Sequence, residues 1–453
     1  MKKILAIGCG GAGMFSVIVP LQLKKNKFKA TVLSDEADIY CRCSTPYILT
    51  EETTVAEAIQ SEDLFTPYGF DIVHEKALSI DTKKQQVKTA AGNVFEYDYL
   101  VIATGASPMK LPIAGIDAEG VYTVRTSEDA SGIYAAAKQA KRAVVIGAGV
   151  IGMEMAGALR QMGLAVHLVE YGQAISHNIA DAEFSDKIVA NLQAHGVEVM
   201  FDSKVAEIKT EGQAKKIIIN HTGHDVVVEA DLVIVAAGIR PNLAVIEGTD
   251  IKANELGILV DKKMRTNIKN VYACGDCCVP ISAVTGENKP SSLASSAVQQ
   301  AKVVGYQIAG YPIAYAGSTG AFAFKIMEKE YACVGLTEDI ARKQFKWVIV
   351  GHAQVTDLYQ DLKAAQPLEV KLIFAGPTMR LVGYEAFGAG VVSSAEVASL
   401  AIGLKLSVLK LLKFNYIAHP SLTPWPFMNP IVMAAEDALG KAVNKLKTFV
   451  GKK

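Results

Sequence analysis

Two glycine-rich segments, each directly after an apolar run, constrain the fold of this 453-residue chain more than any other feature. The first, ILAIGCGGAGMF, has the spacing Gly-x-Gly-x-x-Gly from Gly8 to Gly13. The second, RAVVIGAGVIGMEMAGAL, repeats that spacing from Gly147 to Gly152. In this pattern a strand ends in a tight turn, the backbone approaches a pyrophosphate at the second glycine, and a helix begins whose amino end faces the phosphates. Two copies therefore predict two dinucleotide-binding units in an α/β chain.

An acidic residue is expected about twenty residues after each pattern, where its carboxylate accepts hydrogen bonds from ribose hydroxyls. The run KATVLSD ends at Asp35, with Glu36 as the alternative, and LAVHLVE ends at Glu170. A carboxylate at Glu170 would repel a 2′-phosphate, and the next residues, YGQ, supply no cation to bind one. The second unit is therefore predicted to prefer NADH to NADPH. The two units together fit one flavin and one nicotinamide dinucleotide.

Composition argues against several other classes of protein. The 46 basic and 46 acidic residues balance, so the totals give no reason to expect a nucleic acid partner. The amino-terminal apolar run is too short for a signal peptide. The apolar segment 397–414 carries Lys405, Lys410 and Lys413. These lysines favour a core helix with one solvent-exposed face over a membrane span. Seven unevenly spaced cysteines form no disulfide framework, which predicts a cytoplasmic protein with reduced thiols.

Further strand-to-loop segments carry a family resemblance. YLVIATGASP contains Ala103, Thr104 and Gly105, and VYACGDCC contains Gly275 and Asp276. With the two glycine patterns and the segment AAGIRPN, they resemble the two-dinucleotide flavoprotein disulfide reductase superfamily over nearly the whole chain. The resemblance implies FAD and NADH as cofactors and places Asp276 at the ribityl chain of the flavin. The candidate cofactor-binding residues are Gly8, Gly10, Gly11, Ala12, Gly13, Asp35, Arg42, Ala103, Thr104, Gly105, Ala106, Gly147, Gly149, Val150, Ile151, Gly152, Glu154, Glu170, Gly238, Gly275 and Asp276.

The same resemblance implies three domains and a homodimer. Residues 1–112 and 246–318 are expected to form a discontinuous FAD-binding domain, and residues 113–245 an NAD-binding domain inserted between them. Residues 319–453 are expected to form an α+β dimerisation domain that completes the partner's active site. Two features of the second helix bear on the cofactors. Glu154 is expected near the nicotinamide and flavin, the alternative being an ordinary helix residue, and Val150 and Ile151 stand where many relatives carry an aromatic lid.

The segment YCRCSTPY supplies the candidate nucleophile. Its Cys43-x-x-Pro-Tyr motif resembles coenzyme A-disulfide reductases and NADH-dependent persulfide reductases, and NADH oxidases and peroxidases share the position with one redox cysteine. Ser44 or Thr45 can cap a helix that has Pro46 in its first turn. Cys43 would then precede a helix amino end, with Arg42 beside it. Both features are expected to lower the pKa of the thiol and to favour the thiolate.

Other candidates leave alternatives open. Cys41 is either a resolving thiol, in a strained C-x-C pair, or a bystander. His419, in YIAHPSLTP, is either an acid–base catalyst that reaches the partner subunit's cysteine or an ordinary histidine in an interface turn. The remaining cysteines are expected to fill buried space. No metal site is predicted, because the spacing around Asp276 matches no zinc pattern.

The leading functional hypothesis is an NADH-dependent flavoprotein that reduces low-molecular-weight disulfides, persulfides or polysulfides through Cys43, with a small-molecule sulfur acceptor that could be linked to coenzyme A. One alternative is an NADH oxidase or peroxidase in which Cys43 cycles through a sulfenic acid. The other is an NADH-binding flavoprotein that serves a protein electron acceptor or senses redox state.

Overall fold

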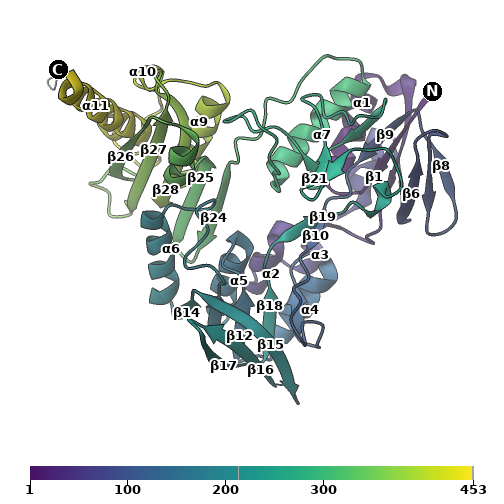
Figure 1. Ribbon diagram of the computed structural model, residues 1–453, viewed down its shortest axis with the longest axis horizontal. Helices are drawn as coiled ribbons and strands as arrows, with labels where there is room; N and C mark the ends of the chain where they lie inside the picture. The colour runs from purple at the N-terminus through teal and green to yellow at the C-terminus, as the bar shows by residue number, and fades with distance from the viewer. Residues whose placement is uncertain (213, 451–453) are drawn as a thin grey trace.

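The computed structural model describes residues 1–212 and 214–450 and contains three five-stranded sheets, each with its own covering helices (Figure 1). The first sheet is parallel. Its strands, in spatial order, are β22 (Val271–Ala273), β9 (Tyr99–Ile102), β1 (Lys2–Ile7), β2 (Phe28–Leu33) and β5 (Asp71–Val73). Helices α1 (Gly11–Leu23) and α7 (Ala294–Ile308) pack against each other beside it. The run from Ile4 to Ile7 is buried throughout, as expected of a parallel strand in the middle of a sheet.

The second sheet repeats this architecture in the middle of the chain. Its parallel strands are β11 (Val121–Thr123), β18 (Leu232–Val235), β12 (Arg142–Ile146), β13 (Ala165–Val169) and β14 (Val197–Met200), and its helices are α4 (Ser127–Ala137), α5 (Val150–Gln161) and α6 (Ala182–Ala194). An antiparallel sheet of β15 (Ser203–Glu211), β16 (Ala214–His221) and β17 (His224–Ala230) lies between β14 and β18 in the chain. In the chain, four strands of the first sheet (β1, β2, β5 and β9) come before this central segment, and β22 comes after it.

The third sheet is antiparallel and forms the carboxy-terminal part. Its strands, in spatial order, are β24 (Phe322–Ile326), β25 (Lys329–Gly335), β28 (Arg380–Gly388), β27 (Pro367–Ala375) and β26 (Val348–Thr356). Its helices are α8 (Glu338–Gln344), α9 (Val391–Gly403), α10 (Val408–Leu411) and α11 (Pro430–Val450). Helix α11 lies along β26 and β27, and α6 of the central part lies beneath β24 and β28 (Figure 1).

The other helices and strands are short. They are α2 (Thr45–Leu49), α3 (Val55–Ala58), β3 (Ile39–Tyr40), β4 (Ile59–Gln60), β6 (Ala77–Asp81), β7 (Gln86–Thr89), β8 (Val94–Glu96), β10 (Ala106–Pro108), β19 (Ile239–Pro241), β20 (Ala253–Asn254), β21 (Gly257–Leu259) and β23 (Cys278–Val279). Strands β10 and β19 form the antiparallel ribbon through which the chain enters and leaves the central part.

The predicted α/β class, with two Rossmann-like sheets and an α+β carboxy-terminal part, is confirmed. The predicted domain limits remain predictions. The single helix expected over 397–414 is wrong, because Lys405 adopts a left-handed φ of 54° between α9 and α10 and ends the first helix. Among the helices in the described part of the chain, none is both long and apolar enough to cross a bilayer.

Candidate active site

A cavity of about 2200 Å3 is lined by residues from all three parts of the chain. Helices α2 and α5 pack against each other beside it, and α5 also contacts β24. The predicted site residues that line the cavity are Gly8, Gly10, Gly11, Ala12, Asp35, Cys41, Arg42, Cys43, Ala103, Thr104, Gly105, Gly147, Gly149, Val150, Ile151, Glu154, Glu170, Gly238, Gly275 and Asp276. The fold thus brings both glycine loops and the cysteine pair to one space.

The first glycine loop has the geometry that a pyrophosphate requires. Gly8 has a φ of +109°, and a Cβ there would lie 2.2 Å from the carbonyl oxygen of Ala103. A Cβ on Gly13 would lie 1.8 Å from the carbonyl oxygen of Gly8, so this glycine lets α1 pack on the loop. At Gly10 a Cβ would meet nothing within 4 Å. Helix α1 has no side-chain cap and no acid in its first turn, so its amino end is open to an anion.

The second loop repeats each of these features. Gly147 has a φ of +105°, and a Cβ on Gly152 would lie 1.9 Å from the carbonyl oxygen of Gly147. Gly149 faces open space and precedes α5, which also lacks a side-chain cap and an acid in its first turn. Both loops therefore fit a dinucleotide, and in both the third glycine serves packing instead of lining the cavity.

The strand register distinguishes the two ribose positions. The N–H of Gly8 donates to the carbonyl oxygen of Leu33 at 2.8 Å, and the N–H of Gly147 donates to the carbonyl oxygen of Val169 at 2.8 Å. Ser34 is therefore the structural equivalent of Glu170 in the first unit. Asp35 lies one residue further, lines the cavity and approaches Lys76 at 3.9 Å. Its assignment to the flavin ribose stays a prediction.

Glu170 lies directly after β13 and is held by the loop that it faces. One carboxylate oxygen accepts from the N–H of Ala148 and the other from the N–H of Gly172, each at 2.7 Å. These bonds fix the carboxylate in the cavity wall beside the second glycine loop. Each oxygen keeps a lone pair that can accept a bond from a ribose hydroxyl.

Glu170→Ala is expected to raise the KM for NADH about tenfold or more, because hydrogen bonds to a charged group contribute about 1.5–3 kcal/mol each. The visible spectrum of the bound flavin should stay unchanged. Steady-state kinetics at saturating acceptor measure the effect. Glu198→Ala, which removes an exposed carboxylate on β14, is the matched control. An unchanged KM in the Glu170 variant would remove this residue from the NADH site.

The cysteine segment is held by short elements. Strand β3 pairs with β4, a 3-10 turn spans Arg42–Ser44, and α2 follows with Pro46 in its first turn. The N–H of Cys41 donates to Ala58 at 2.9 Å. The predicted cap is wrong, because neither hydroxyl caps α2. The Thr45 hydroxyl is buried and instead contacts the Tyr40 hydroxyl at 2.8 Å, while α2 itself is only five residues long.

The pKa of Cys43 is raised, which corrects the expectation of a lowered value. The thiol is accessible from the cavity, but the surrounding walls shield it from bulk water. That desolvation is the largest cause of the upward shift, followed by the nearby Cys41 and Glu154, and Arg42 only partly opposes it. The guanidinium of Arg42 binds both carboxylate oxygens of Glu36, at 2.8 and 2.9 Å. The protein's own charges therefore do not favour the thiolate.

Glu154 faces the cysteine segment from α5. Burial raises the pKa of its carboxyl to about 7, and the backbone N–H of Lys325 on β24 partly opposes the shift. Its charge acts on both Cys43 and Tyr47. A carboxyl that is half-protonated near neutral pH beside a thiol can hold or release a proton during thiol chemistry.

Arg125 is a cavity residue that sequence reasoning missed. It follows β11, and its guanidinium lies 3.9 Å from the carboxylate of Asp276. Its backbone carbonyl accepts a bond from Arg42 at 3.3 Å. Burial raises the pKa of Asp276, and the positive charges of Arg125 and Arg42 counteract that rise. The only local signal was a lone arginine between a strand and the capping residue Thr126, which by itself indicates no ligand.

The buried cysteines show the packing expected of them. The thiols of Cys274, Cys277 and Cys278 have no exposed surface and lie within reach of backbone carbonyls. Burial raises the pKa of each. Cys9 also lies in the first loop, where burial raises its pKa to about 12. In the described residues no group of three or more His, Cys, Asp or Glu side chains is arranged to hold a metal.

Besides the packing glycines Gly13 and Gly152, two predicted residues lie apart from the cavity lining. Ala106 is buried on β10. His419 lies in an exposed turn, where its ring nitrogen contacts the Ser421 hydroxyl at 3.2 Å. The predicted role of His419 requires a partner subunit and stays a prediction.

Two family models match the chain. The model described as pyridine nucleotide-disulphide oxidoreductase matches residues 2–301, and the dimerisation domain of the same family matches residues 321–426. The first match spans both glycine loops, the cysteine segment and Asp276. The second spans all five strands of the antiparallel carboxy-terminal sheet.

Three similar proteins illustrate the range of names among the relatives. The chain is similar to an NADH oxidase of Methanocaldococcus jannaschii, at 31% identity over 98% of this chain and 100% of the relative. It is also similar to an NAD(P)H coenzyme A polysulfide/persulfide reductase of Pyrococcus horikoshii, at 28% identity over 88% of this chain and 90% of the relative. A solved NAD-dependent persulfide reductase from A. fulgidus superposes with a TM-score of 0.89 and 29% identity, covering 97% of this chain and 83% of that one.

Proposed function

Because the chain belongs to the pyridine nucleotide-disulphide oxidoreductase family, we propose that it uses NADH to reduce low-molecular-weight disulfides, persulfides or polysulfides through Cys43. As a member of that family it is an FAD-dependent NAD(P)H oxidoreductase. The first glycine loop, with Asp276, is assigned to FAD, and the second, with Glu170, to NADH. The names of the P. horikoshii and A. fulgidus relatives support a sulfur acceptor, and the former supports a link to coenzyme A.

The observation that carries the proposal is the position of Cys43. Its thiol is accessible from the cavity that both glycine loops line. The thiol, the two predicted dinucleotide-binding loops and the carboxyl of Glu154 therefore lie around one cavity. Five other cysteines of the chain, Cys9, Cys274, Cys277, Cys278 and Cys333, are buried. Only Cys41 and Cys43 are exposed and can meet a small substrate.

The chemistry assigned to the chain's own residues is thiol–disulfide exchange. When bound, NADH and FAD supply hydride transfer and two-electron reduction. The Cys43 thiolate attacks one sulfur of the acceptor, the S–S bond breaks, and a mixed disulfide forms on Cys43. The departing thiolate takes a proton, which the carboxyl of Glu154 can supply. Two electrons from NADH are then needed to release the second thiol and restore Cys43.

An anaerobic assay of NADH oxidation across acceptors tests this proposal. Coenzyme A disulfide, coenzyme A persulfide, polysulfide, cystine and peroxide should be compared at equal concentration. Fast turnover with a sulfur acceptor is the expected result. Turnover with peroxide alone, or slow turnover with every one of them, would reject it.

An NADH oxidase or peroxidase is the second candidate, favoured by the name of the M. jannaschii relative. Cys43 would then pass through a sulfenic acid. The exposed Cys41 weighs against it, because a neighbouring thiol would trap the sulfenate as a disulfide. The remaining alternative, electron delivery to a protein partner or redox sensing, predicts slow turnover with all small acceptors.

Cys41→Ser decides between the two roles of Cys41. If Cys41 resolves the mixed disulfide, Cys43 of the variant should still attack the acceptor, but turnover should stall and an adduct on Cys43 should accumulate. Intact-mass spectrometry after one anaerobic turnover detects that adduct. Turnover at the wild-type rate with no adduct would make Cys41 a bystander.

We also propose a homodimer, which the match to the dimerisation domain supports. Exposed apolar side chains gather in the carboxy-terminal part, including Leu400, Leu404, Ile417, Leu422 and Phe427. Burial of such side chains stabilises subunit association. His419 lies in the same segment, from which it would have to reach the partner's Cys43.

A further inference from the structure

The segment 171–179 forms one wall of the cavity and is anchored by the carboxy-terminal part of the chain. It follows Glu170 and leads to α6, and every one of its residues lines the cavity. The Thr337 hydroxyl donates to the carbonyl of His177, and the Tyr331 hydroxyl donates to the carbonyl of Ile179, each at 2.7 Å. The ring of His177 contacts Asp339 at 2.8 Å. The wall is thus fixed from outside its own sheet.

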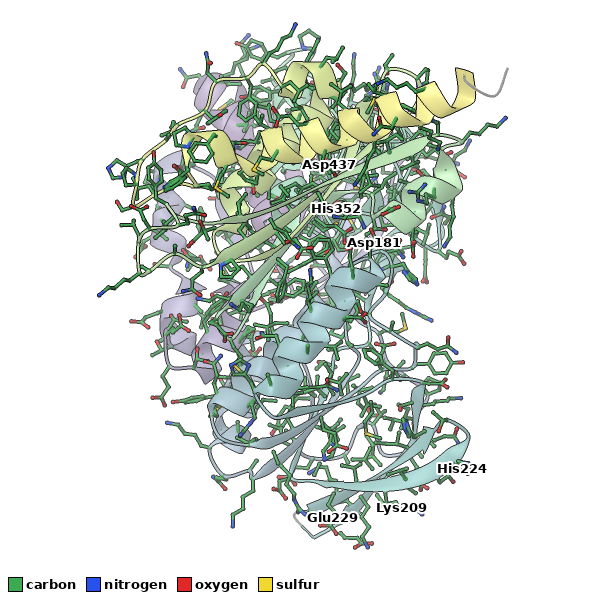
Figure 2. The ribbon with its side chains drawn as sticks, turned by 90° about the vertical axis from the view of Figure 1, so that its left-hand side faces the viewer. Asp181, Lys209, His224, Glu229, His352 and Asp437 are labelled. Carbon is green, nitrogen blue, oxygen red and sulfur yellow. The ribbon has the colours of Figure 1, made fainter. Side chains whose placement is uncertain are left out.

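Asp181 joins this wall to α8. Figure 2 shows it at the end of α6 that meets the carboxy-terminal sheet. Its carboxylate accepts from the backbone N–H groups of Glu338 at 2.7 Å and Asp339 at 3.1 Å. Thr337, the residue before α8, makes no cap because its hydroxyl is used on His177. Asp181 therefore caps a helix in a different part of the fold, and that helix places Ile340 and Lys343 in the cavity lining.

Lys371 lies at the centre of this junction. It is only 2% exposed on β27, and its ammonium lies 2.8 Å from Asp181, 2.7 Å from Glu183, 3.1 Å from Glu338 and 3.6 Å from Glu385. Removing one member of such a buried group leaves uncompensated charge behind, so the members hold one another in place.

Glu385 completes the junction from β28. One of its carboxyl oxygens accepts from the N–H of Asp181 and lies next to the Tyr331 hydroxyl, both at 2.8 Å. Burial, and then the neighbouring Asp181 carboxylate, raises the pKa of Glu385 to about 9, so it is neutral at pH 7. Burial also disfavours charge on Asp181, but hydrogen bonds from Glu385 and Lys371 lower its pKa to about 2. Asp181 is thus the ionised partner of Lys371.

We propose that the Lys371 cluster, defined as Lys371, Asp181, Glu338 and Glu385, positions the NADH-binding wall. It holds two cavity walls in one arrangement: the segment after Glu170, and α8 with Ile340 and Lys343. The inference rests on the proposed assignment of the second glycine loop to NADH. None of the four side chains lines the cavity, so they act on NADH only through the walls that they hold.

Lys371→Met tests the cluster by removing the charge while keeping most of the side-chain volume. Anaerobic stopped-flow reduction of the flavin gives both the Kd for NADH and the limiting rate. The Kd should rise about tenfold or more while the limiting rate stays within about twofold, because the walls shift and the reacting atoms do not. The matched control is Lys187→Met, since Lys187 of α6 pairs with Glu369 of β27 across the same junction and neither residue lines the cavity. It should leave both values unchanged.

Several outcomes would overturn the inference. An unchanged Kd in Lys371→Met contradicts it, and so do equal changes in both lysine variants. If Lys371→Met fails to fold, the double variant Thr337→Val/Tyr331→Phe decides, because it deletes the two bonds to the wall and the Tyr331–Glu385 contact but keeps every charged group of the Lys371 cluster. Its Kd should rise about threefold or more, and an unchanged Kd would overturn the inference. If NADH does not reduce the wild-type flavin at all, the proposed function itself fails, which is a distinct result.

Discussion

Replacing Cys43 by serine should abolish the reduction of disulfides and persulfides, with a loss of roughly 10⁴-fold or more, as for other essential nucleophiles. A serine hydroxyl is not ionised near neutral pH and cannot attack sulfur in this role. NADH should still reduce the bound flavin, because that half-reaction needs no thiol. Anaerobic stopped-flow spectroscopy separates the two half-reactions.

The matched control is Cys333→Ala. Cys333 is a buried thiol on β25 that does not line the cavity, so its variant should keep sulfur reduction. If Cys43→Ser stayed active on sulfur acceptors, the reductase assignment would fail. If it lost flavin reduction as well, Cys43 would be needed for the cofactor site and not for the attack on sulfur.

Asp276→Ala should cause the protein to lose FAD. The variant removes a carboxylate assigned to the ribityl hydroxyls and leaves the partly buried Arg125 beside an empty position. A loss of about 1.5–3 kcal/mol of binding free energy corresponds to a rise in the Kd for FAD of roughly 10- to 100-fold. The ratio of flavin to protein after gel filtration measures this effect.

Asp261→Ala serves as its control. Asp261 is another aspartate of the predicted FAD-binding domain, but it pairs with Arg265 and does not line the cavity. Its variant should keep its flavin. Full flavin occupancy in Asp276→Ala would count against assigning the first glycine loop and Asp276 to FAD.

The glycine loops could be predicted from sequence because their requirement is local. A positive φ at Gly8 and Gly147, and carbonyl oxygens under 2 Å from any Cβ on Gly13 and Gly152, follow from one strand, one turn and one helix. The position of Glu170 was predictable for the same reason. That Ser34, and not Asp35, takes the position equivalent to Glu170 in the first unit could not be predicted. This position depends on strand register, which a single apolar run does not define.

The electrostatics of Cys43 could not be predicted from its neighbours in the chain. Arg42 is adjacent in sequence, but its guanidinium binds Glu36, and the charge that most opposes the thiolate after Cys41 comes from Glu154 on another helix. Arg125 and the Lys371 cluster were missed for a related reason. Each joins segments far apart in the chain, and a lone arginine or lysine in the sequence gives no sign of the carboxylates that the fold brings to it.

The most direct test of the account is the anaerobic stoichiometry of the wild-type enzyme with its fastest sulfur acceptor. Each NADH oxidised should release two thiols from a disulfide, or one thiol and one sulfide from a persulfide, because NADH carries two electrons and each S–S bond takes two. NADH oxidation that proceeds only with oxygen or peroxide, and that releases no thiol or sulfide, would contradict reduction of sulfur through Cys43.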